Sequence, residues 1–508
     1  MQLKKHAKSA KKIDEQTILL TENEGIKSSA DRQESEKVKR MGYAPIPKLL
    51  AEFAFPAIFG MLVNGAYNLI DSIFLGQGAG EIGLSTITVA TPIMTLYIAL
   101  ALLVGNGGNA VAALRLGAGK HDEAELALGN TFFLAIFVAG IMAFLAFSPA
   151  VEVLLSISSA TEEVRPYART FIQIISGGYI FQMVGMSLNN FIRTAGAPNK
   201  ALATMVIGAV FCTIFNYLFV LVFHWGIVGS AFATILGQAI SCATVVWYFI
   251  GKTKSPLRLH IVSMKPQLNM IKCILSLGAA SFVVEAGFAL INFATNYLLV
   301  VWGAQSAIGA AGALASIGVV QRITMFTILP LIGLSVAMQP LLGFNYGACL
   351  YNRVRSTLRY GIISGIAMGT GFWLIVHIWP VEIVSTFGIT DESLRNFTIF
   401  ALKVQLFALP LIGYQIVCSN YFQATGQPMM SIILSLSREV IFLFPLLFGL
   451  PYILPSILPE FSGLDAIYFA APLADALSIV VTALFIKREM NRIKHLEENK
   501  QNPAFGVE

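Results

Sequence analysis

Long apolar stretches follow one another along almost the whole chain from Lys48 onward. Each runs for about 20 residues or more, the length that an α-helix needs to cross a hydrocarbon core of about 30 Å. Twelve of them are found, at about 48–75, 82–107, 124–148, 164–192, 199–222, 227–250, 268–302, 308–343, 354–378, 395–423, 429–449 and 464–487. They are continuous rather than alternating, which excludes the strands of a porin-like barrel. The pattern predicts an all-α integral membrane protein with twelve transmembrane helices.

The composition agrees with this prediction. Charged residues make up 12% of the chain and hydrophobic residues 56%, with a mean hydropathy of +0.72. Soluble proteins carry about 25% charged residues, so a cytosolic enzyme, a nucleic-acid-binding protein and a secreted disulfide scaffold are all excluded. The five cysteines have no spacing typical of a metal site. We therefore predict no disulfide, no metal cluster and no nucleic-acid partner.

Basic residues concentrate in every second connection between the predicted spans. These connections carry Arg115 and Lys120, Arg193 and Lys200, Lys252 to Lys265, Arg353 and Arg355, and Lys487 to Lys494. The alternate connections hold few basic residues or none, and several of them are acidic. Because Lys and Arg are retained on the cytoplasmic side, we predict a multi-pass protein of the plasma (inner) membrane with both termini in the cytoplasm. Residues 1–44 are expected to be a disordered tail and 489–508 a second tail.

The two halves of the chain resemble each other at a shift of about 230 residues. Asn190-Phe-Ile-Arg-Thr-Ala-Gly196-Ala-Pro198 is echoed by Asn420-Tyr-Phe-Gln-Ala-Thr-Gly426-Gln-Pro428. Six spans separate the copies, so both halves have the same topology. We predict six-helix lobes at 45–250 and 268–488, joined by a cytoplasmic linker at 251–267 and related by a pseudo-two-fold axis along the membrane normal. Transporters with such parallel repeats hold the substrate between the repeats.

Several ionisable residues interrupt the apolar spans, each at a cost of about 2.5–3.5 kcal/mol near a helix centre. The second half contains three acids and three bases, namely Glu285, Arg322, Lys403, Arg438, Glu439 and Asp475. These charges can neutralise one another. For Glu285, two alternatives stay open, which are ion binding and a structural pair with Arg322.

The first half differs, because Asp71 is its only charge deep within a span. It lies in Asn68-Leu-Ile-Asp71-Ser-Ile-Phe-Leu-Gly76, and no basic residue of that half is placed to meet it. A buried carboxylate without a counter-ion takes up a proton or binds a small cation. Asp71 is therefore our main candidate for an ion-coupling site. The alternative is a carboxylate satisfied by hydroxyl groups and by amides such as that of Asn68.

No nucleotide or cofactor motif is found. Gly251-Lys252-Thr253 ends like a phosphate loop, but Val246 stands where that loop requires glycine. We therefore predict no cofactor, no enzymatic activity, and transport driven by a gradient of H⁺ or Na⁺.

Four segments resemble the multidrug and toxin extrusion (MATE) family of antiporters over about residues 45–490. They are Tyr67 to Gly76, Leu116 to Ala124, Gln339-Pro340-Leu-Leu-Gly-Phe-Asn345-Tyr-Gly-Ala348, and Gln423 to Pro428. The resemblance implies two six-helix lobes around a V-shaped cavity and export of cationic drugs against Na⁺ or H⁺. Asp71 matches the family's first-helix carboxylate. Two departures stand out: Val220 replaces an acid that one branch has after Asn216, and Glu285 is displaced by about one turn from another branch's cation-binding glutamate.

The predicted function is thus an antiporter for lipophilic cationic small molecules that works by alternating access, as a monomer in the lipid bilayer. The candidate coupling and substrate residues are Asp71, Asn68, Glu285, Asp475, Arg322 and Gln339, with Na⁺ as a candidate ligand of Asp71 or Glu285. A related alternative is a flippase for lipid-linked saccharides, although the near-balanced charges do not suit a pyrophosphate. A membrane transferase is a further alternative, but no connection carries a catalytic cluster.

Overall fold

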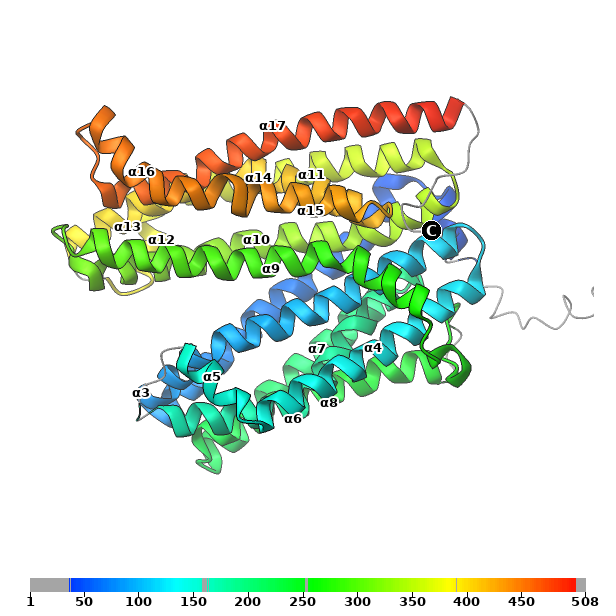
Figure 1. Ribbon diagram of the computed structural model, residues 1–508, viewed down its shortest axis with the longest axis horizontal. Helices are drawn as coiled ribbons and strands as arrows, with labels where there is room; N and C mark the ends of the chain where they lie inside the picture. Colours follow the sequence, from blue (N-terminus) through cyan, green and yellow to red (C-terminus); the bar gives the residue numbers. More distant parts are fainter. Residues whose placement is uncertain are drawn as a thin grey trace, which may run out of the picture.

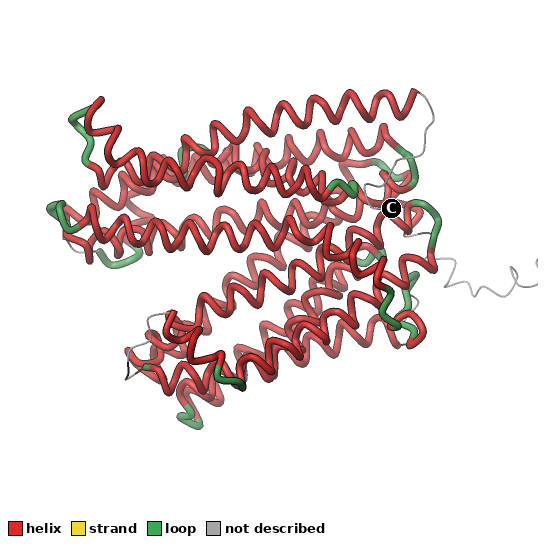
Figure 2. The backbone as a smooth tube through the Cα atoms, in the orientation of Figure 1, coloured by secondary structure: helices red, strands yellow, loops and turns green. Residues whose placement is uncertain are grey.

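The structure, a computed structural model, describes residues 36, 38–157, 162, 164–251, 255–389 and 391–498. All regular elements in these residues are helices (Figure 2). The first lobe consists of α3 (Ile46–Gly117), α4 (His121–Phe147), α5 (Ala150–Ile157), α6 (Arg165–Thr194), α7 (Pro198–Asn216), the π-helix η1 (Tyr217–Val222) and α8 (Gly226–Ile250). The linker contains a short 3₁₀-helix, η2 (Ile261–Met264). The second lobe consists of α9 (Leu268–Gly303), α10 (Gly309–Gly347), α11 (Tyr351–Ile378), α12 (Pro380–Ser385), α13 (Glu392–Gln405), α14 (Leu409–Ala424), α15 (Pro428–Leu436), the π-helix η3 (Ser437–Leu443), α16 (Phe444–Ile457) and α17 (Gly463–Glu498).

The predicted membrane spans are confirmed, with two differences. The described residues hold eleven helices that are long and apolar enough to cross a membrane, or twelve if α13 and α14 together form one bent span. The first two of these, Ile46–Gly78 and Ser85–Gly117, both lie within α3. The span expected at 395–423 is broken by 43° between α13 and α14. Pro410, in the first turn of α14, has no backbone N–H to continue the preceding helix.

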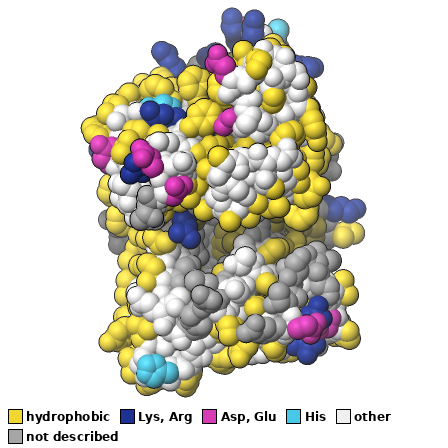
Figure 3. Space-filling view, turned by 90° about the vertical axis from the view of Figure 1, so that its left-hand side faces the viewer, with side chains coloured by type: hydrophobic (Ala, Val, Ile, Leu, Met, Phe, Trp, Pro, Cys, Tyr) yellow, Lys and Arg dark blue, Asp and Glu magenta, His cyan; other side chains and the backbone are white. Residues whose placement is uncertain are grey.

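The two lobes meet at one end of the molecule and diverge toward the other (Figure 1). The start of α3, the end of α17 and the linker all lie at the end where the lobes meet, which we call the closed end. The opposite end, the open end, includes the α9–α10 and α16–α17 connections. Seen from that end, the lobes are separated by a recess (Figure 3).

A close helix crossing at the closed end follows the internal repeat. A Cβ atom on Gly117 would overlap the carbonyl group of Phe344, and one on Gly347 would overlap that of Leu114. Both glycines and both carbonyls are related by the same 230-residue shift. The pseudo-two-fold axis therefore passes between the two crossings, and the sequence repeat is a repeat of the fold.

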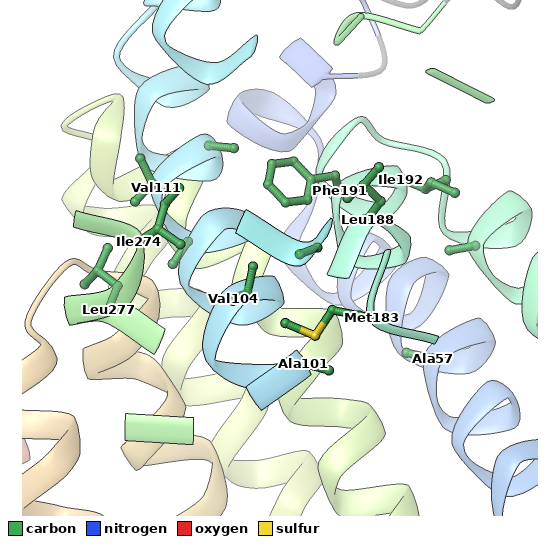
Figure 4. Close-up of a cluster of buried hydrophobic side chains, with 14 of the residues drawn as sticks. Ala57, Ala101, Val104, Val111, Met183, Leu188, Phe191, Ile192, Ile274 and Leu277 are labelled. Atoms are coloured by element: carbon green, nitrogen blue, oxygen red, sulfur yellow. The ribbon is translucent and has the colours of Figure 1, made fainter. Parts of the chain in front are cut away.

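The largest apolar core also lies across the junction of the lobes. It includes α3, α4, α6 and α8 of the first lobe together with parts of α9, α10, α11 and α14 of the second. Figure 4 shows Ile274 and Leu277 of α9 beside Val111 of α3. A separate core, from Ile291 to Ala474, lies entirely within the second lobe. The lobes are therefore packed together at the closed end.

Both regions predicted as tails include residues that are helical and packed against the rest of the protein. Residues 38–43 are helical, and Val38 and Met41 are buried against the closed end, because these apolar side chains lie on one face of the helix. At the other terminus, α17 continues to Glu498 and buries Ile493. The remaining parts of both tails, residues 1–35 and 499–508, lie outside the described residues.

Candidate functional site

Asp71 lies in the first span of α3, between α7 and α8. The hydroxyl of Ser230, on α8, donates to Asp71 Oδ1 over 3.2 Å, and Asn216, the last residue of α7, interacts with the same carboxylate. Ser230 and Asn216 are both buried, whereas Asp71 is only partly buried. Among the described residues, no basic side chain lies within ion-pair distance of Asp71. Within this part of the chain, the carboxylate is therefore held by neutral groups.

Asn216 contributes a further acceptor to this centre. Its Nδ2 donates to Cys212 Sγ over 3.6 Å, but its Oδ1 is buried with no hydrogen-bond donor in the described structure. A buried acceptor without a partner is rare and requires a reason. Here it lies next to a carboxylate and a hydroxyl, and oxygen atoms of these kinds are the ligands that hard cations take. The residues therefore suit either a proton on Asp71 or a small cation shared with Asn216.

The backbone around Asn216 explains its placement. The helix changes to π-helical winding directly after Asn216, in η1, and such segments are frequent at functional sites. Val220, on η1, is buried and fills the space where a Cβ on Gly78 would lie. The position where one branch of the family has an acid is thus used here for packing η1 against α3.

Asn68 lies on the exposed side of α3, where its Nδ2 donates to the carbonyl oxygen of Asn64 over 2.8 Å. The partners seen at the carboxylate are Ser230 and Asn216, which are 159 and 145 residues beyond Asp71 in the chain. Apart from the family pattern that includes Asn216, the sequence offered no signal for these partners.

The second lobe contains a charged centre around Arg438. Arg438 Nε donates to Asp475 Oδ1 over 2.6 Å, and Nη1 donates to the neighbouring Glu439. Asp475 is 2% exposed, and its Oδ2 has no partner within the described residues. Arg438 and Glu439 lie in the π-helix η3. One guanidinium thus bridges two carboxylates.

Glu285 joins this centre from α9, but Arg322 does not. Its carboxylate lies close enough to Glu439 for the two charges to repel each other. A Cβ on Gly287 would lie 3.2 Å from Glu439 Cβ, so α9 and η3 pack closely here. Arg322 is exposed and forms no ion pair with Glu285 in the described parts of the chain. The proposed Glu285–Arg322 pair is therefore wrong.

Gln339 lies apart from both centres, at the junction of the lobes. Asn109 Nδ2 donates to Gln339 Oε1 over 2.9 Å, and these two residues are 230 positions apart in the chain. Thr194 Oγ1 donates to Asn109 Oδ1 over 2.6 Å. Nearby, Asn106 Nδ2 donates to Ser281 Oγ over 3.0 Å, again from one lobe to the other. This polar contact was not predicted, although the matching positions of Asn109 and Gln339 in the two repeats would have indicated it.

The fold and these centres define a multi-pass membrane transporter built from two repeated lobes. The family model described as MatE matches residues 56–218 and 281–448. The chain therefore belongs to the MATE family of multidrug efflux transporters, and the resemblance found in the sequence is confirmed.

Individual relatives agree with this assignment. The chain is 24% identical to the multidrug export protein MepA of Staphylococcus haemolyticus, over 81% of this chain and 90% of that protein. Its identity to MepA of Staphylococcus aureus (strain NCTC 8325) is 23%, over 87% and 97%. A solved multidrug resistance MATE family transporter in an outward-facing conformation has the same fold, with a TM-score of 0.81 and 21% identity over 90% of this chain and 98% of that one. The comparisons do not favour the flippase alternative.

Proposed function

We propose that this protein is a secondary active exporter that moves lipophilic organic cations out of the cell in exchange for inward movement of H⁺ or Na⁺. The observation that carries the proposal is the Asp71 centre. A carboxylate with only neutral partners, beside the unpartnered Asn216 Oδ1, is a place where a cation is gained and lost in each cycle. The proposal also includes alternating access, with the closed end facing the cytoplasm because basic residues gather there.

In this scheme, the ion reaches Asp71 while the recess is open to the outside. H⁺ would bind to the carboxylate itself, whereas Na⁺ would be held by Asp71, the Ser230 hydroxyl and Asn216 Oδ1. Either ion removes the net charge of the centre. Asp71 and Ser230 lie on different helices, so neutralisation changes the force that holds α3 against α8. Drug and ion would then compete through linked free energies, without sharing one site.

The substrate preference follows from the side chains that the spans carry. Aromatic residues make up 11% of the chain, and their ring faces attract cations. The MepA relatives are multidrug export proteins, which supports a broad range of substrates. The carboxylates of both lobes favour positive over negative charge. We therefore expect lipophilic monovalent cations to be preferred.

The test is efflux of tetraphenylphosphonium, a lipophilic monovalent cation, from proteoliposomes that hold the purified protein. Separate Na⁺ and pH gradients are applied in either direction. We expect efflux with one of these gradients and none without a gradient. A lipophilic anion, tetraphenylborate, serves as the comparison. Transport of the anion alone would contradict the proposal, and so would a rate of tetraphenylphosphonium transport that is independent of both the Na⁺ and the pH gradient.

A further inference from the structure

Two short segments at the closed end each precede the first helix of one lobe. The N-terminal clasp, residues 38–44, precedes α3, and the linker clasp, residues 255–267, precedes α9. Each segment is held by polar side chains of the other lobe. The N-terminal clasp is held by the second lobe, and the linker clasp is held by the first lobe. They are thus placed at equivalent positions in the two repeats.

The N-terminal clasp is held by α10 and α11 of the second lobe. Arg353 Nη2 donates to the carbonyl oxygens of Met41 over 2.9 Å and of Ala44 over 2.7 Å. Asn345 Nδ2 also donates to the Met41 carbonyl, over 3.0 Å, and accepts from Arg353 Nε over 2.9 Å. Met41 is fully buried. The start of α3 is therefore fastened to the second lobe by its backbone.

The linker clasp is held by α4 of the first lobe in a similar way. Asn130 Nδ2 donates to the carbonyl oxygens of Ser263 and Lys265, each over 3.3 Å, and Asn130 Oδ1 accepts from the backbone N–H of Gln267 over 2.8 Å. A Cβ on Gly129 would overlap the Ser263 carbonyl, so α4 and the linker are in close contact. The start of α9 is therefore fastened to the first lobe.

Proline explains why each clasp needs a partner from elsewhere. In a helix, the Met41 carbonyl would accept from residue 45, and in a 3₁₀ turn the Ser263 carbonyl would accept from residue 266. Both of these residues are prolines, Pro45 and Pro266, which have no N–H to donate. Arg353 and Asn130 replace the missing donors. Because the clasps lie at the end of the molecule that carries the basic connections, water can replace these donors when a clasp opens.

We propose that the two clasps hold the closed end shut reversibly. The contacts between each clasp and the opposite lobe must break before that end can open. This inference rests on the alternating access of the proposed function. Each clasp is bound to one lobe, whereas the helix that follows it is part of the other lobe: α3 is part of the first lobe and α9 is part of the second. Parting the lobes at this end therefore either breaks the contacts of Arg353 and Asn130 or requires the chain to bend at the prolines that follow.

Cross-linking tests the release directly. With the five native cysteines replaced, Gly42→Cys and Leu350→Cys place thiols on the N-terminal clasp and on the second lobe. A Cβ on Gly42 would lie 3.5 Å from Leu350 Cδ1, within reach of a short bifunctional thiol reagent. We expect the cross-link to reduce tetraphenylphosphonium efflux at least tenfold. Failure of the pair to cross-link, or efflux at the rate of the untreated protein, would overturn the proposal; the latter would show bending at the prolines instead.

A matched control joins two residues within the second lobe at the same end. Asn352 on α11 donates to Glu497 on α17, so Asn352→Cys with Glu497→Cys takes the same reagent. This cross-link does not bridge the lobes and should leave efflux unchanged. If it stopped efflux equally, loss of transport in the first pair could not come from the clasp, and the proposal would fail.

A distance measurement separates failure of the clasps from failure of the proposed function. Spin labels at the exposed side chains of Val153 on α5 and Val381 on α12 report closure of the recess without any transport, because these helices belong to opposite lobes and lie at the open end. We expect Arg353→Ala and Asn130→Ala to increase the closed-recess population at least threefold, Arg353→Lys to have a smaller effect, and Arg359→Ala, an exposed change on α11, to have none. Unchanged distances in Arg353→Ala and Asn130→Ala would overturn the clasp proposal, even if efflux is normal.

Discussion

The two lobes repeat one fold but surround the carboxylates within their membrane spans with opposite kinds of partner. In the first lobe, Asp71 is held by the neutral side chains of Ser230 and Asn216. In the second lobe, Asp475 and Glu439 share the guanidinium of Arg438. Symmetry of the backbone therefore does not extend to the charges.

This difference separates a structural role from an exchange role. A buried carboxylate that is paired with an arginine is costly to neutralise, because the arginine is then left without its partner. A carboxylate with neutral partners can gain a proton or a cation and leave no charge behind. The first lobe is thus suited to exchange an ion, whereas the Arg438 centre holds η3 and α17 together. Glu285, beside Glu439, is the residue of the second lobe that departs from this division.

Replacing Asp71 should have the largest effect on transport. Asp71→Asn is nearly isosteric, so we expect folded protein in normal amounts but gradient-driven efflux at the level of empty liposomes. Binding of tetraphenylphosphonium should persist, because binding alone does not need a group that exchanges an ion. Efflux and equilibrium binding are measured on the same preparation. Gradient-driven efflux at the wild-type rate would show that Asp71 does not exchange the ion, and would contradict the assignment of ion exchange to the first lobe.

Removing Arg438 should have the largest effect on stability. Arg438→Met leaves two carboxylates without their shared partner, and breaking a buried ion pair in this way costs about 3–5 kcal/mol. Thermal unfolding in detergent measures the loss. Arg322→Met, at an exposed arginine of the same lobe, is the control and should change the stability by less than about 0.5 kcal/mol. A variant at Arg438 that is as stable as this control would show that the second centre is not structural.

Ser230→Ala should have an intermediate effect and identify the ion. If Na⁺ binds at Asp71, loss of the hydroxyl ligand should raise the Na⁺ concentration for half-maximal efflux about tenfold, the equivalent of about 1.4 kcal/mol. If a proton binds, loss of a donor to the ionised carboxylate favours the protonated form, and efflux should continue to higher pH. Asn68→Ala, one turn away on the exposed side of α3, should change neither quantity. Equal effects of both substitutions would exclude a specific role for Ser230.

Glu285→Gln should have the smallest effect on folding. The change removes repulsion from Glu439, so the stability should stay the same or rise by an amount on the order of 1 kcal/mol or less. Glu439→Gln is the matched comparison and should be destabilising, because Glu439 pairs with Arg438. If Glu285 also binds the coupling ion, Glu285→Gln will shift the ion dependence of efflux at constant stability. A loss of stability as large as that of Arg438→Met would place Glu285 in the structural network instead.

Within the candidate sites, the sequence predicted which charged residues lie alone in a span better than it predicted which residues they contact. A single charge in an apolar span is visible in the sequence, so Asp71 could be selected without any structure. Arg322 shows the limit of this reasoning. Like Arg438, it is an arginine within a predicted membrane span, but Arg322 is exposed on α10, whereas Arg438 reaches Asp475 on α17. The rotation of each helix about its axis decides between these outcomes.

The sequence by itself determined the membrane spans, the two-fold repeat and the family, because span length and repeated motifs are local properties of the chain. Only the tertiary structure decided that Asp71 meets Ser230 and Asn216, that Arg438 bridges two carboxylates, and that Arg353 holds the backbone of Met41. The physical reason is that these contacts join helices far apart in the chain. Their formation depends on how the helices pack and rotate against one another, and apolar spans of similar composition leave that packing open until the whole bundle has assembled.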